Sequence, residues 1–101
     1  MRAYLISDNA ETYEGMRLAG IDGMVTESPA LIGKALLSLS HSADCALILI
    51  TERAYELARE EVDAFMATHT RPIVTRIPDR HGSAGQQGVS NFFQNGIGLR
   101  S

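Results

Sequence analysis

An uncharged, apolar run of six residues, CALILI at 45–50, constrains the fold of this chain more than any other stretch. The run does not alternate apolar with polar residues, which is typical of a strand buried on both faces in a parallel sheet. Thr51 and Glu52 follow at once and begin a helical pattern. A strand that leads directly into a helix predicts a right-handed crossover, the unit of an α/β fold. The alternative, a buried helix segment, is disfavoured by the short length and polar flanks.

Three further stretches are predicted strands, at residues 3–7, 21–26 and 72–77. The strands at 3–7 and 45–50 are the most apolar, so they are expected at the centre of the sheet. The strand at 21–26 is less apolar, and the one at 72–77 begins with proline, which suits edge positions. These features predict an α/β fold with a four-stranded parallel sheet of order 2-1-3-4 and helices on both faces.

The segments between the strands carry helix signals. The first helix is expected over 11–19, with Asp8 or Asn9 as its cap and Gly20 as its end. The second begins at Ser28 and proline follows it, and the third runs without interruption from a Thr51 cap to about residue 67. The side chains expected to face the sheet are Tyr13, Met16, Ala19, Leu31, Ile32, Ala35, Leu36, Leu39, Ala54, Leu57, Ala58, Val62, Phe65 and Met66. Gly15, inside the first helix, suggests a close approach of that helix to a strand.

The composition changes after residue 78. Residues 1–78 are expected to form a Rossmann-like α/β domain, and 79–101 a flexible linker with a C-terminal helical tail. The linker, at 79–88, is polar and glycine-rich. The tail becomes apolar again and reads as a short helix with Val89, Phe92 and Phe93 on one side. Such a helix is too short to be stable alone in water, so it must dock on its own domain or on a partner.

Composition excludes several classes of function. The formal charge is −3 and the nine basic residues are scattered, which argues against a nucleic-acid surface. One cysteine, Cys45, cannot form an internal disulfide and suits a reducing compartment. No apolar run approaches the roughly 20 residues of a membrane span, so we expect a cytoplasmic protein without direct membrane insertion.

Candidate catalytic groups are few. Asp8 and Glu52 follow the two central strands, where ligands bind in open α/β sheets, and two carboxylates there suit acid/base chemistry or Mg²⁺. Roles at helix N-termini explain them more simply. A phospho-acceptor receiver domain would need an aspartate where Thr51 stands and a lysine after a fifth strand, and the one lysine is Lys34. The histidine and glycine spacings match no metal site or phosphate loop, so no cofactor is expected.

Four blocks resemble the F subunit of the vacuolar/archaeal-type (V-type) rotary ATPases: LISD at 5–8, GMRLAGI at 15–21, ILITE at 48–52 and PIVTRIP at 72–78. Their order and spacing agree with that family from one end of the chain to the other. The resemblance implies a non-catalytic central-stalk protein that binds the D subunit, which forms the shaft. It also implies a part in rotation and in regulating ATP hydrolysis coupled to ion transport, with the nucleotide sites on the A and B subunits.

Contact with a partner is therefore expected through the tail and the basic residues near its root, namely Phe92, Phe93, Ile97, Leu99, Arg76 and Arg80. The complex would hold the chain at the cytoplasmic side of the membrane as a peripheral component. The first alternative is a stand-alone, receiver-like protein that handles a small ligand or phosphoryl group with Asp8 and Glu52. The second is a self-associating adaptor whose tail swaps between identical chains.

Overall fold

The computed structural model of the chain describes residues 2–78. Strands and helices alternate along them, except where two helices follow each other. The elements are β1 (Arg2–Ser7), α1 (Ala10–Leu18), β2 (Asp22–Val25), α2 (Pro29–Ser40), β3 (Cys45–Thr51), α3 (Glu52–Leu57), α4 (Arg59–Thr68) and β4 (Ile73–Ile77). The predicted linker and helical tail at 79–101 lie outside the described residues.

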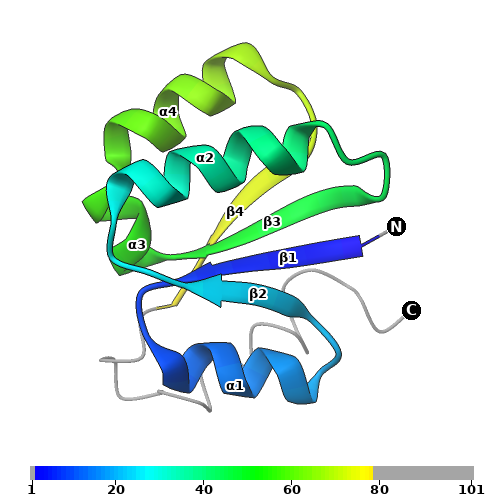
Figure 1. The fold of residues 1–101 in the computed structure, drawn as a ribbon, viewed down its shortest axis with the longest axis vertical. Helices are drawn as coiled ribbons and strands as arrows, with labels where there is room; N and C mark the ends of the chain where they lie inside the picture. The colour runs from blue at the N-terminus through cyan, green and yellow to red at the C-terminus, as the bar shows by residue number, and fades with distance from the viewer. Residues whose placement is uncertain (1, 79–101) are drawn as a thin grey trace.

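All four strands are parallel and lie in the order β2-β1-β3-β4 (Figure 1), which confirms the predicted fold class. In β3, the side chains of Ile48, Leu49 and Ile50 are fully buried, as expected of a strand covered on both faces. Leu5 of β1 lies between Leu49 of β3 and Gly23 of β2, so the middle of the sheet is in register across three strands.

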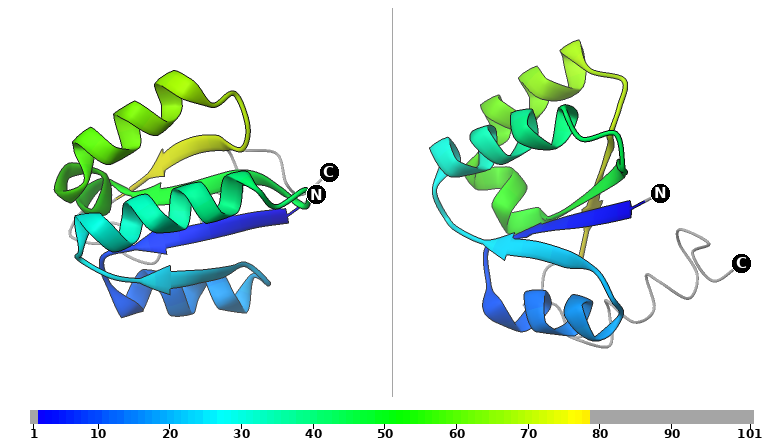
Figure 2. Two further views of the ribbon diagram at one scale, coloured as in Figure 1. Left: turned by 45° about the horizontal axis from the view of Figure 1, so that its top comes forward. Right: turned by 45° about the vertical axis from the view of Figure 1, so that its right-hand side comes forward.

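Helices cover both faces of the sheet. Helix α1 lies on one face, and α2, α3 and α4 lie on the other (Figures 1 and 2). Neighbouring residues of a strand point to opposite faces, so the core has two parts. The α1 side contains Leu5, Met16, Ile21, Leu49 and Ile77. The other side is larger and contains Ile6, Ile32, Leu36, Cys45, Ile48, Ile50, Ala54, Tyr55, Ala58, Val62 and Phe65.

Three predicted N-caps and one predicted C-terminal end of a helix are confirmed. Asn9, rather than Asp8, caps α1 by accepting a hydrogen bond from the Thr12 N–H at 2.7 Å. Ser28 and Thr51 cap α2 and α3 in the same way. Gly20 ends the first helical segment with φ +85°, a conformation that glycine adopts without strain.

The single helix predicted from Thr51 to residue 67 is wrong, because the helix breaks at Ala58. That residue has φ −121° and ψ 35°, and its N–H donates to the carbonyls of both Ala54 and Tyr55. On its two sides, α3 contacts the ends of the strands, whereas α4 packs along α2. Packing of the two segments on different neighbours accounts for a break at a residue type that favours helix.

Some predicted buried positions are also wrong. In α1 the buried residues are Thr12 and Met16, and Ala19 is exposed. Leu31 and Met66 are 48% and 44% exposed. Gly15 is not explained by close packing, because within the described part of the chain a Cβ built there meets no atom within 4 Å. The close approach is at Gly23, where a Cβ would lie 2.6 Å from the Leu5 carbonyl oxygen.

Candidate interface at the carboxyl end of the sheet

Asp8 and Thr51 connect the carboxyl ends of the two central strands. The Thr51 hydroxyl donates to Asp8 Oδ1 at 2.8 Å and accepts hydrogen bonds from the backbone N–H groups of Asp8 and Ala54, each at 3.3 Å. The Asn9 side-chain amide donates to the same Asp8 oxygen at 3.1 Å. Asp8 therefore fixes the ends of β1 and β3 relative to each other. The interpretation in terms of helix termini holds for Thr51 and Glu52 but not for Asp8, because Asn9 caps α1.

Glu52, the second candidate carboxylate, is directed to β4. Its Oε1 lies 3.9 Å from Nη1 of Arg76, and the two side chains are 44% and 54% exposed. An ion pair this exposed contributes at most about 1 kcal/mol to stability. No group of three or more histidine, cysteine, aspartate or glutamate side chains suited to a metal ion occurs within residues 2–78.

Tyr55 is the centre of the cluster around Arg76. The guanidinium carbons of Arg76 and Arg59 lie 4.7 and 5.3 Å from the centre of its ring, within the range of cation–π attraction. The phenol donates a hydrogen bond of 2.8 Å to Oδ1 of Asp63. The ring thus joins α3, α4 and β4 through one aromatic side chain, with positive charge beside its face and negative charge at its hydroxyl.

The hydrogen bond to Asp63 is the main reason that the pKa of Tyr55 is raised, because it holds the phenol in its neutral form. Desolvation and the negative charge of Asp63 raise the pKa of Tyr55 further, and Arg59 and Arg76 oppose them. The pKa of Tyr4, in β1, is raised mainly by burial and then by Asp22.

A hollow of about 280 Å³ lies beside the Tyr55 ring, lined by Tyr55, Val62, Met66, Val74 and Arg76. Met66 is a large apolar side chain that remains exposed beside this hollow. Ile73 of β4 is also exposed, but it precedes Val74 in the strand and therefore points to the opposite, α1 side of the sheet. In the described sheet, β4 is an outermost strand. Arginine and tyrosine beside exposed apolar groups are typical of the central part of protein–protein interfaces. Among the described residues, this arrangement is therefore suited to binding a protein rather than to covalent chemistry.

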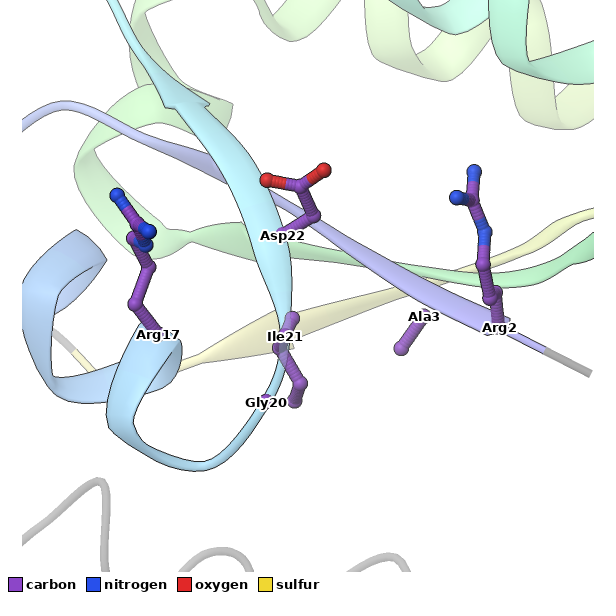
Figure 3. Close-up of a pocket in the computed structure, with 6 residues that line it drawn as sticks. All are labelled: Arg2, Ala3, Arg17, Gly20, Ile21 and Asp22. Atoms are coloured by element: carbon purple, nitrogen blue, oxygen red, sulfur yellow. The ribbon is translucent and has the colours of Figure 1, made fainter.

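A second hollow, of about 500 Å³, lies near the start of β1 and β2 (Figure 3). Arg17 from α1 and Arg2 from β1 stand on either side of it, with the Asp22 carboxylate between them. Arg17 also lies over the Tyr13 ring, 5.8 Å from its centre. Both signs of charge line this hollow, so it is a polar surface without a clear preference for one kind of ion.

Of the residues predicted to contact a partner, the structure describes Arg76, which lies in the Tyr55 cluster. Arg80, Phe92, Phe93, Ile97 and Leu99 lie outside the described residues. Sequence reasoning missed Tyr55, which was not assigned to any buried stripe. The signal available was Arg59 four residues after it, since residues four apart in a helix are neighbours on its surface.

Comparisons with known proteins agree with the four sequence blocks. Residues 3–92 match the family described as ATP synthase (F/14-kDa) subunit. The F subunits of the A-type ATP synthases of Methanococcus maripaludis (strain C5) and Methanococcus vannielii are both 28% identical to this chain over 102 residues. Each alignment covers 98% of this chain and 97% of its relative. Among the described residues, no helix has the length and apolar character needed to cross a membrane.

The match of residues 3–92 confirms the resemblance, and the chain belongs to the family of ATP synthase F subunits.

Proposed function

We propose that this chain is a non-catalytic component of the central stalk of a rotary ATPase or ATP synthase. In this role it binds the D subunit of the shaft and takes part in rotation and in regulating ATP hydrolysis coupled to ion transport. The observation that carries the proposal is the match of residues 3–92 to the F-subunit family, together with relatives that align over nearly their whole length. The complex would hold the chain at the cytoplasmic side of the membrane as a peripheral component.

The candidate carboxylates support a non-catalytic role. Asp8 is hydrogen-bonded to Thr51 and Asn9, and Glu52 lies beside Arg76. Both groups therefore have contacts within the fold that account for them without a bound ligand. A protein that used these carboxylates to bind Mg²⁺ or a nucleotide would melt at a higher temperature in their presence, by mass action. We expect no such shift with millimolar Mg²⁺ and ATP.

The position of the Tyr55 cluster supports a shared interface with the tail. Arg76 lies in β4, the last described strand, and the chain passes from there into residues 79–101. Arg76 thus lies shortly before the segment that carries Phe92 and Phe93, and we propose that a partner that binds the two phenylalanines also contacts Arg76. Without its partner, the isolated chain would dock these two phenylalanines on its own domain, bury them by self-association or expose them.

The test is the affinity of the full chain for the purified D subunit. Replacing Phe92→Ala and Phe93→Ala together removes two rings, each worth about 1.5–3 kcal/mol when buried, so the affinity is expected to fall about a hundredfold or more. Asn91→Ala and Gln94→Ala, two polar neighbours in the same segment, serve as the matched control and are expected to bind like the wild type. Equal affinity of the phenylalanine variant would remove the tail from the interface.

A further inference from the structure

Helices α2 and α4 lie side by side on the face of the sheet opposite α1 (Figures 1 and 2). An apolar groove is lined by residues of both helices. Its volume is about 320 Å³. The residues that line it recur at helical spacing on both walls, with Ala30, Gly33 and Leu37 on α2 and Glu61, Ala64, Phe65 and Thr68 on α4. The groove is separate from the Tyr55 hollow, which lies toward β4 and is lined by Val62 and Met66 of the same helix.

Small residues line this groove. Gly33 lets α4 approach α2 closely, because a Cβ built on Gly33 would lie 3.3 Å from Glu61 Cγ. Ala30 and Ala64 add only methyl groups to the lining. Leu37 projects beside them and is 54% exposed. A groove with a small-residue floor and an exposed leucine fits the apolar stripe of a helix, because the helix backbone can approach closely while its side chains cover the leucine.

The charges on the two walls have opposite signs. Lys34 lines the groove on α2, and Glu61 lines it on α4, with Glu60 exposed next to it. An anionic membrane surface would be repelled by the two glutamates. A helix whose apolar stripe has acidic residues on one border and basic residues on the other would match both walls, as the flanking positions of coiled-coil helices do.

We propose that the α2–α4 groove is a docking site for an amphipathic helix of another protein in the rotary complex. The basic border of this helix faces Glu60 and Glu61, and its acidic border faces Lys34. The proposal rests on the proposed function, because the partner belongs to the same complex. It adds a second contact, made by the folded domain itself, to the contact expected of the tail.

The test measures binding of the full chain to a purified peripheral ATPase complex that lacks this component. Ala64→Gln fills the groove with a residue that favours helix. Ala10→Gln places the same side chain at an exposed position of α1, on the opposite face of the sheet, as the matched control. Leu37→Glu puts a charge in the groove, and Leu18→Glu, on a leucine that is 90% exposed in α1, is its control. We expect each groove variant to bind about tenfold more weakly and each control within about twofold of the wild type.

The outcomes separate this proposal from the proposed function. If Ala64→Gln binds like the wild type while the Phe92 and Phe93 double variant does not, the groove proposal is overturned and the proposed function stands. If the wild-type chain does not bind the complex, both are overturned. If light scattering shows that the isolated chain is a dimer that Leu37→Glu and Ala64→Gln make monomeric, the occupant is a second copy of this chain and the partner-helix proposal is overturned. Should Leu37→Glu fail to fold, Ala64→Gln decides.

Discussion

The guanidinium carbon of Arg76 lies 4.7 Å from the centre of the Tyr55 ring, and this contact joins the last described strand to the helix after β3. Arg76 was predicted to contact a partner, and in the structure its side chain packs on Tyr55. Because the Arg76 side chain is about half exposed, the contact is available to a partner as well as to Tyr55.

Arg76→Ala is expected to lower the free energy of unfolding by only about 0.5–1 kcal/mol, the range of an exposed cation–π contact. The loss of affinity for the D subunit should be larger, because arginine is often a major contributor at interfaces. Urea unfolding and a binding titration measure the two effects separately. Arg59→Ala, which removes the other guanidinium near Tyr55, is the comparison. Equal effects of the two variants on affinity would contradict a specific role of Arg76.

Thr51→Val is expected to destabilise the fold by about 2 kcal/mol or more. The substitution keeps the shape but leaves the Ala54 N–H and the Asp8 carboxylate without the hydroxyl they share. Thr51→Ser keeps the hydroxyl and removes one buried methyl group, at a cost of about 1 kcal/mol. Chemical denaturation of the two variants is the measurement, and a serine variant less stable than the valine variant would contradict the assigned hydrogen bonds.

Two glycine substitutions are expected to have opposite effects. Gly23→Ala places a methyl group 2.6 Å from the Leu5 carbonyl oxygen, which is backbone and cannot move without disturbing the pairing of β1 with β2. We expect a loss of about 1–3 kcal/mol. Gly15→Ala adds a methyl group in the middle of α1, where the described residues leave space, and should stabilise by up to about 1 kcal/mol. Thermal unfolding of both variants tests the placement of α1 and β2.

The raised pKa of Tyr55 predicts a loss of stability in alkali. The pKa in the folded state lies above that of the unfolded chain, so the stabilisation is complete below about pH 10 and is lost as the pH rises through the folded-state pKa. Asp63→Asn removes the negative charge and should lower the pKa of Tyr55. The difference in tyrosinate absorbance between wild type and Tyr55→Phe isolates this group from the other tyrosines. An unchanged titration in Asp63→Asn would contradict the hydrogen bond.

Much of the fold could be predicted from local signals. The uncharged run of β3 indicated a doubly covered central strand, and the order of the strands followed from the relative apolarity of the four. Ser28, Thr51 and Gly20 marked helix ends correctly, because capping and positive φ depend on a residue and its immediate neighbours. These features need little information from distant parts of the chain.

The wrong or missing predictions concern positions whose structure depends on contacts with residues far away in the sequence. Nothing in the sequence around Ala58 breaks a helix, and the break results from packing of α3 and α4 on different neighbours. Tyr55 gains its place from Arg76 and Asp63, which lie on other elements. Position 23 requires glycine because the pairing of β1 with β2 brings it so close to Leu5 that a Cβ would not fit. Such positions cannot be recognised from local patterns.

The most direct test of the central claim is to purify the affinity-tagged full chain from native membranes of the organism that encodes it and to identify the proteins that accompany it. Membership of the central stalk predicts recovery of the D subunit together with the A and B subunits, in fixed ratios. It also predicts that the isolated chain does not hydrolyse ATP. Recovery of the chain without ATPase subunits, or turnover of ATP by the chain alone, would contradict the account.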